Sequence, residues 1–200
     1  MDRGDFVEQQ EIEQLSKTLT SLMELYDDCR IQGLLCPNEP EFRAYHIIGR
    51  VQDDHIEQQA HDWPEEIFGD QKVQAALKMY ASVQSSIIGQ SNTEVYQSFP
   101  GRFWSVLRST QMTYLMACLA GTHLALIRGS ALNTILASHR TRQKTQDWSL
   151  SDLTELLCLS SEDDTRQLCT DHGLNISARD DGQPGLIIEP SNSVLERELC

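Results

Sequence analysis

Acidic residues, which often serve in catalysis, occur here in a pattern that does not assemble a catalytic site. They form five adjacent pairs, each at a predicted helix end or turn: Asp27-Asp28, Asp53-Asp54, Glu65-Glu66, Asp163-Asp164 and Asp180-Asp181. Neighbouring residues on a helix do not face one another, so these pairs are poorly suited to acid–base chemistry. Helix capping and solvation explain them, and we expect no catalytic residue in this chain.

Two cysteine-containing patterns leave alternatives open. Cys118 and His123 are five residues apart with no third group to orient them, so a small Cys/His hydrolase stays an alternative function. Cys29, Cys36 and His46 lack the close spacing of zinc ligands. The sequence also lacks a glycine-rich phosphate loop. We therefore expect no metal, no cofactor and no small-molecule substrate.

The charge of the chain is strongly uneven along its length. The net charge is −14, with −11 in residues 1–74, +5 in residues 75–150 and −8 in residues 151–200. An acidic chain is not expected to bind nucleic acid tightly by itself, but the basic middle leaves room for a local phosphate contact. The candidates for that contact lie on a polar link and on a predicted hairpin: Arg140, Arg142, Lys144 and Arg179.

Hydropathy and cysteine usage bear on the compartment. The sequence has no run of about 18 apolar residues, and no apolar segment of a signal peptide follows Met1, so we expect no membrane insertion. The six cysteines are widely scattered, which favours reduced thiols in a nucleus or cytoplasm over a disulfide scaffold.

The segment from Cys36 to Val51 organises the rest of the chain. Pro37 ends any arriving helix, and Asn38 is expected to begin a new one as N-cap, in a capping box with Glu41. One face of this helix consists of Ala44, Ile47, Ile48 and Val51, and Phe42 and Tyr45 form a second. A helix that is apolar on two sides must be packed on two sides, which indicates an inner helix of a solenoid.

The remaining helices follow from apolar periodicity and capping signals. One long helix is predicted over residues 6–31, ending at Gly33, and another begins at Asp70. Pro100-Gly101 is expected to kink or split the segment that opens at Ser91. Residues 111–138 predict two buried helices that meet near residues 127–129.

The C-terminal part follows a different pattern. Two short helices are predicted, capped by Ser149 or Ser151 and by Ser160 or Ser161, followed by strands at residues 174–179 and 186–189. Two helices and a β-hairpin resemble a winged helix. The predicted fold is therefore mainly α: an α-solenoid (helical-repeat) PCI domain with residues 6–145 helical, residues 146–190 forming a small winged helix, and residues 191–200 a tail.

The sequence from residue 38 to residue 45 is specific for one family. Together with segments 13–22 and 25–28, it resembles the SAC/GANP family of mRNA-export scaffolds, and the resemblance covers most of residues 10–178. The matching positions considered structural are Asn38, Glu39, Glu41, Phe42, Arg43, Tyr45 and Arg128. We expect Arg43 and Arg128 to bond carboxylates or helix-end carbonyls of the neighbouring repeat, with a partner contact as the alternative.

The resemblance implies a non-catalytic PCI subunit of the nuclear TREX-type transcription–export complex, with association at the nuclear pore as a further expectation. Its implied partners are a second PCI-domain protein, a small acidic peptide of the DSS type, and the backbone of RNA or DNA. The residues expected to form an exposed hairpin edge for the second PCI protein are Ile176, Ala178, Leu186 and Ile188. A PCI subunit of a proteasome-lid-like or translation-initiation assembly is the alternative with the same fold.

Overall fold

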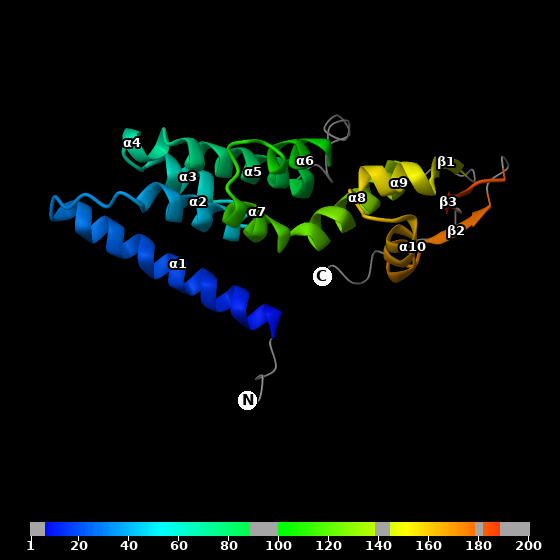
Figure 1. Cartoon of the computed structure of the whole chain (residues 1–200), viewed down its shortest axis with the longest axis horizontal. Coiled ribbons are helices and arrows are strands. Elements are labelled where there is room, and N and C mark those ends of the chain that lie inside the picture. Colours follow the sequence, from blue (N-terminus) through cyan, green and yellow to red (C-terminus); the bar gives the residue numbers. More distant parts are fainter. Residues whose placement is uncertain (1–6, 89–99, 139–144, 179–181, 189–200) are drawn as a thin grey trace. The chain divides into compact units, whose positions relative to one another are not determined.

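The computed structural model describes residues 7–88, 100–138, 145–178 and 182–188 (Figure 1). The chain separates into two compact units. The first unit comprises residues 1–85 and 105–124, and the second comprises residues 86–104 and 125–200. The boundary expected between residues 145 and 146 therefore falls inside the second unit.

The described residues of the first unit form helices joined by turns, and none of them lies in a strand. It contains α1 (Glu8–Ile31), α2 (Glu39–Gly49), α3 (Ile56–His61), α4 (Glu65–Phe68), most of α5 (Gln71–Ile88) and α7 (Tyr114–Gly121), while α6 (Gly101–Leu107) begins in the second unit and ends in the first. The sequence did not predict α3, because only Ile56 and Ala60 in that polar segment are buried. Two apolar residues four apart are too few for a periodic signal.

The turn between α1 and α2 has one predicted cap and lacks another. Gly33 has a φ of +74°, and the N–H groups of Gly33 and Leu34 bond the carbonyls of Arg30 and Cys29, both at 2.9 Å. This is the expected glycine-terminated helix end. The capping box of Asn38 is wrong: its backbone is helical (φ −92°, ψ 0°) and its side chain makes no capping bond. An N-cap side chain normally needs an extended backbone to reach the free amides.

The core of the first unit is built around α2, as the sequence predicted. Ala44, Ile47, Ile48 and Val51 are fully buried. The helix packs against α1 on one side and α7 on another. Arg43 and His46 are buried on the same helix, which its apolar periodicity alone did not indicate.

The second unit combines helices with a small antiparallel sheet. Along the chain its elements are α8 (Leu124–Ser138), β1 (Thr145–Ser149), α9 (Leu150–Leu156), α10 (Glu162–Asp171), β2 (Asn175–Ala178) and β3 (Pro184–Ile188). The strands lie in the order β1-β3-β2. In β3, Leu186 stands opposite Trp148 on one side and Ile176 on the other. The predicted hairpin is present, and β1 is an additional strand that the sequence did not predict.

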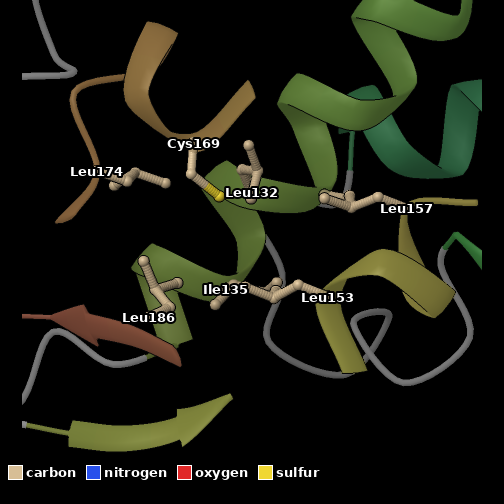
Figure 2. Packing of buried hydrophobic residues seen from close by; sticks show 8 residues of the cluster. Leu132, Ile135, Leu153, Leu157, Cys169, Leu174 and Leu186 are labelled. Carbon is tan, nitrogen blue, oxygen red and sulfur yellow. The ribbon is translucent and has the colours of Figure 1, made fainter. Parts of the chain in front are cut away.

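The core of the second unit gathers side chains from α8, both short helices and the sheet (Figure 2). Leu132 and Ile135 of α8 meet residues of the other elements in one cluster: Leu153, Leu157, Cys169, Leu174 and Leu186. The caps are those that the sequence allowed, with Ser149 and Asp152 forming a capping box on α9 and Ser161 capping α10. Gly173, with φ +69°, ends α10.

The apolar stretch of residues 111–138 differs from the prediction in two respects. Its helices meet at Thr122 and His123 instead of near residues 127–129. Tyr114 and Leu115, which the density of apolar residues had placed inside, are exposed. Helix α6 begins at Gly101, directly after Pro100, and the predicted cap at Ser91 lies outside the described residues.

In the described part of the chain, no single helix is long and apolar enough to cross a membrane. There, only α7 together with α8 as far as Leu136 reaches that length and composition, as a bent pair of helices.

Candidate partner surfaces and the buried family motif

Arg43 connects three segments of the first unit through its buried guanidinium group. The residue is 2% exposed. Its Nε donates to Glu39 Oε1 at 2.8 Å, and its Nη2 donates to Asp27 of α1. The guanidinium carbon also lies 4.6 Å from the ring centroid of Trp63, a cation–π distance. The prediction that Arg43 bonds carboxylates is confirmed, and its charge is used inside the unit.

The other residues of the motif also stabilise the packing of α2. Arg30 of α1 donates to the buried carboxylate of Glu39. Glu41 accepts from Tyr45 Oη at 2.5 Å and from Lys72 Nζ of α5 at 2.7 Å. The bond from Lys72, and to a smaller extent that from Tyr45, holds the pKa of Glu41 below its usual value. Glu41 thus joins two helices and takes no part in the capping that its position suggested.

The aromatic residues of the motif belong to a small cluster of rings. The ring of Phe42 lies 6.4 Å from that of Tyr26 on α1 and 5.6 Å from that of Tyr45, the second pair edge to face. Such distances are typical of favourable aromatic pairs. The motif residues from Glu39 to Tyr45 therefore hold α1, α2 and α5 together, whereas Asn38 is exposed.

Arg128 stabilises the C-terminal end of α9 in the second unit. Its Nε donates to the carbonyl of Leu157 at 3.1 Å and its Nη2 to that of Cys158 at 3.0 Å. Trp104 Nε1 donates to the preceding carbonyl, Leu156 O, at 2.9 Å. A cation is favourable here because the C-terminal end of a helix is electrically negative. The prediction that Arg128 bonds helix-end carbonyls is confirmed.

His46 provides a pH-dependent contribution to stability. Burial, with the nearby charges of Arg50 and Arg43, lowers its pKa from 6.5 to about 4. The unfolded chain therefore binds more protons than the folded chain between pH 4 and pH 6.5. The stabilisation from a neutral His46 is complete above pH 6.5 and is lost as the pH falls toward 4.

We expect the free energy of unfolding to fall by about 2 kcal/mol through His46 between pH 7.5 and pH 5. Urea unfolding at both pH values, in the wild type and in His46→Gln, measures this contribution as the difference between the two pH slopes. His55→Gln is the matched control, because His55 is exposed. Equal slopes in the wild type and in His46→Gln would contradict the assignment.

The described residues do not include the predicted nucleic-acid residues. Arg140, Arg142, Lys144 and Arg179 all lie outside the described residues. On the surface that is described, α10 exposes Glu162, Asp163, Asp164 and Asp171, with Arg166 as an exposed cation. Such a surface is unsuited to a DNA groove, because the phosphates would be repelled.

The predicted hairpin edge is partly wrong. Strand β3 is the central strand of the sheet, since β1 pairs with its other side, and Leu186 is 1% exposed in the core. Ile176 is half-buried against the same core. Ile188 contributes its backbone to the pairing with Thr145. The exposed edge is that of β2, where Asn175, Ser177 and Ala178 are exposed, so only Ala178 of the four predicted residues lies exposed on it.

The alternative Cys/His site does not assemble around its two residues. His123 Nε2 lies 2.8 Å from the carbonyl oxygen of Ile48 and bonds to it. Cys118 is exposed, and its interaction with Tyr114 raises the pKa of the tyrosine. Burial, together with Cys29, raises the pKa of Cys36. In the described part of the chain, no group of three or more His, Cys, Asp or Glu residues could hold a metal ion.

One surface feature escaped the sequence analysis. Large apolar residues remain exposed on α1 and on the turn that follows it. The signal was available, because Leu15, Leu22 and Leu25 accompany Leu19 and Tyr26 and exceed what a single face of a helix can bury.

The fold is that of a mainly helical protein with a small three-stranded sheet. The two arginines of the motif, Arg43 and Arg128, bond carboxylates and backbone carbonyls of the same chain. A comparison with protein families gives the narrower assignment, since the model of the SAC3/GANP family matches residues 1–178. The chain belongs to the SAC3/GANP family.

Three relatives in distant organisms are similar to most of this chain. SAC3 family protein 1 of Schizosaccharomyces pombe is 36% identical over 182 residues, which is 88% of this chain and 18% of the relative. Protein xmas of Drosophila melanogaster is 28% identical over 167 residues (82% and 8%), and SAC3 family protein B of Arabidopsis thaliana is 29% identical over 167 residues (82% and 9%). The chain thus spans less than a fifth of the length of these relatives.

Proposed function

We propose that this chain is a non-catalytic scaffold segment of a nuclear mRNA-export complex. The observation that carries the proposal is the family match over residues 1–178. The internal use of Arg43 and Arg128 supports it, because the bonds of these charged motif residues stabilise packing inside the chain. The proposed location is the nucleus, with association at the nuclear pore as the finer expectation.

The proposed architecture is a PCI domain that ends in a winged helix. The second unit runs helix, strand, helix, helix, strand, strand from α8 to β3, with an antiparallel sheet, and this order resembles a winged helix. The helices of the first unit resemble stacked helical hairpins in that α2 is buried on two sides. Both features support the proposal from the arrangement of the chain.

The proposed partners are those of a PCI subunit: a second PCI-domain protein, a small acidic DSS-type peptide, and the backbone of RNA or DNA. Within the described residues β2 pairs only with β3, so its other edge presents unpaired backbone groups. A partner strand can add to such an edge. The second PCI protein is therefore proposed to dock at β2, and the nucleic acid at Arg140, Arg142, Lys144 and Arg179.

Co-expression with the second PCI-domain subunit of the same organism's export complex tests this proposal. The wild-type chain is expected to elute with that subunit in size-exclusion chromatography. The double variant Ser177→Asp and Ala178→Asp is expected to elute alone, because two carboxylates on the edge strand would be buried without partners. Both residues are exposed in the free chain, so the variant should fold normally.

The matched control is Gln58→Asp with Gln59→Asp, which adds the same charge to exposed positions on α3. This control should retain the complex. A complex that survives the β2 variant would show that β2 is not the docking edge, and a wild-type chain that never binds a PCI subunit would overturn the scaffold proposal.

A further inference from the structure

The exposed apolar residues of the described chain are concentrated at one place in the first unit. Eight large hydrophobic residues are exposed in the described part of the chain. Six of them lie between residues 7 and 35: Val7, Leu15, Leu25, Ile31, Leu34 and Leu35. Ile31 is 84% exposed and Leu35 is 90% exposed. Single exposed apolar residues are ordinary, but a concentration on one helix and its adjoining turn is typical of an interaction surface.

Three leucines form a second apolar stripe on α1. The helix packs on α2, Leu19 and Met23 of α1 are buried, and the Tyr26 ring contacts Phe42 of α2. Leu15, Leu22 and Leu25 are three and seven residues apart and lie roughly a quarter turn around the helix from that packed face. Figure 1 shows α1 at the border of the first unit. We call Leu15, Leu22 and Leu25 the outer stripe. Ile31 lies on a different face of the helix, and Leu34 and Leu35 lie in the turn that follows it.

The spacing of the outer stripe fits another helix. A seven-residue step, here from Leu15 to Leu22, is the repeat by which one helix packs along another. A strand or an irregular segment has no reason to follow that repeat. Alpha-helical partners bind such stripes through apolar residues that recur every three to four positions.

Acidic residues flank the outer stripe on its solvent side. Glu13, Glu24 and Asp28 are exposed there, with Lys17 as the exposed cation among them. A partner that places lysine or arginine beside its own apolar stripe would gain from this field, and an acidic partner would be repelled. A second copy of the chain is also disfavoured, because it carries a net charge of −14 and the same acidic flank.

We propose that the outer stripe of α1 docks an amphipathic helix of a partner protein, with an apolar stripe of its own and basic residues beside it. This interaction is separate from the docking at β2, because it uses the first unit. The acidic DSS-type peptide would be repelled by the acidic residues beside the outer stripe, so the proposed partner is a different protein.

Two synthetic peptides provide the test with the full chain. Both are 21-residue helices with leucine at the first and fourth positions of each of three heptads. One carries lysine beside the leucines and the other carries glutamate. In fluorescence anisotropy at about 50 mM salt, the lysine peptide is expected to bind at least about tenfold more tightly than the glutamate peptide. Raising the salt should reduce that preference, because exposed charges are then screened.

The decisive variant replaces the two exposed residues of the outer stripe, Leu15→Gln and Leu25→Gln. It should weaken binding of the lysine peptide at least about tenfold, because two exposed apolar contacts are removed. Tyr114→Gln with Leu115→Gln is the matched control, since these two large hydrophobic residues are also exposed but lie on α7. The control should bind as the wild type does, and thermal unfolding should show that both variants are folded.

Equal affinity for the two peptides, or an equal loss in the outer-stripe variant and in the control, would overturn the proposal. Dimerisation of the wild-type chain that the outer-stripe variant abolishes would also overturn it, because the occupant would then be a second copy. Neither result bears on the binding of a PCI subunit at β2.

Discussion

Replacing Arg43 with methionine is expected to lower the free energy of unfolding by about 3–5 kcal/mol, the usual cost of removing one partner of a buried ion pair. Methionine preserves most of the apolar stem, so the loss reports the charge. The Glu39 side chain, 6% exposed, would keep Arg30 as its cation but lose its closest buried partner. Urea unfolding followed by far-ultraviolet circular dichroism measures the difference.

Two comparisons separate this effect from a general loss of charge. Arg50→Met removes a partly exposed pair with Asp53 at 2.6 Å and should cost no more than about 1 kcal/mol. The double variant Glu39→Gln with Arg43→Met should lose less stability than the sum of the two single variants, because the bond between the two residues is counted twice in that sum. Equal losses in Arg43→Met and Arg50→Met would show that the Arg43 cluster is not a stabilising one.

Leu186→Asp is expected to unfold the second unit. Leu186 lies among Ile135, Leu153 and other apolar residues of the core, with no cation among the residues of that cluster (Figure 2). A carboxylate placed there loses its hydration without compensation, at a cost of more than about 4 kcal/mol. The fluorescence of Trp104 and Trp148, both in the second unit, should shift to that of exposed indole rings, which an emission spectrum measures.

Ala178→Asp on the neighbouring strand is the control for this prediction. Ala178 is exposed on the edge strand β2, so the change should alter stability by no more than about 0.5 kcal/mol. A folded Leu186→Asp variant with native tryptophan emission would contradict the assignment of Leu186 to the core. The two variants also explain why docking is tested at β2. A substitution of Leu186 in β3 is expected to unfold the unit, so a loss of binding would not report on the interface.

Several local features could be read from the sequence because they depend on neighbouring residues. The helix ends at Gly33 and Gly173 follow from the ease with which glycine adopts a positive φ. The cap at Ser161 follows from a hydroxyl that reaches the amide three residues later. The buried α2 follows from apolar residues on two faces.

Other features depend on residues distant in the sequence and could not be predicted. Glu41 has the position of a capping residue, but Lys72, 31 residues later, binds it. Strand β1 has few apolar residues, and its strand character comes from pairing with β3, about 40 residues away. That pairing turns β3 from an edge strand into a central one and determines the location of Leu186.

The candidate partner surfaces show the same division. Sequence by itself determined the family, the mainly helical fold and the kind of partner that Arg43 and Arg128 bind, because short motifs and periodicity are properties of neighbouring residues. Only the tertiary structure decided which strand edge is open and which stripe of α1 is left uncovered. The reason is physical. Whether a residue is exposed or buried depends on which other segments pack against it, whereas the sequence pattern gives only the polarity of its side chain.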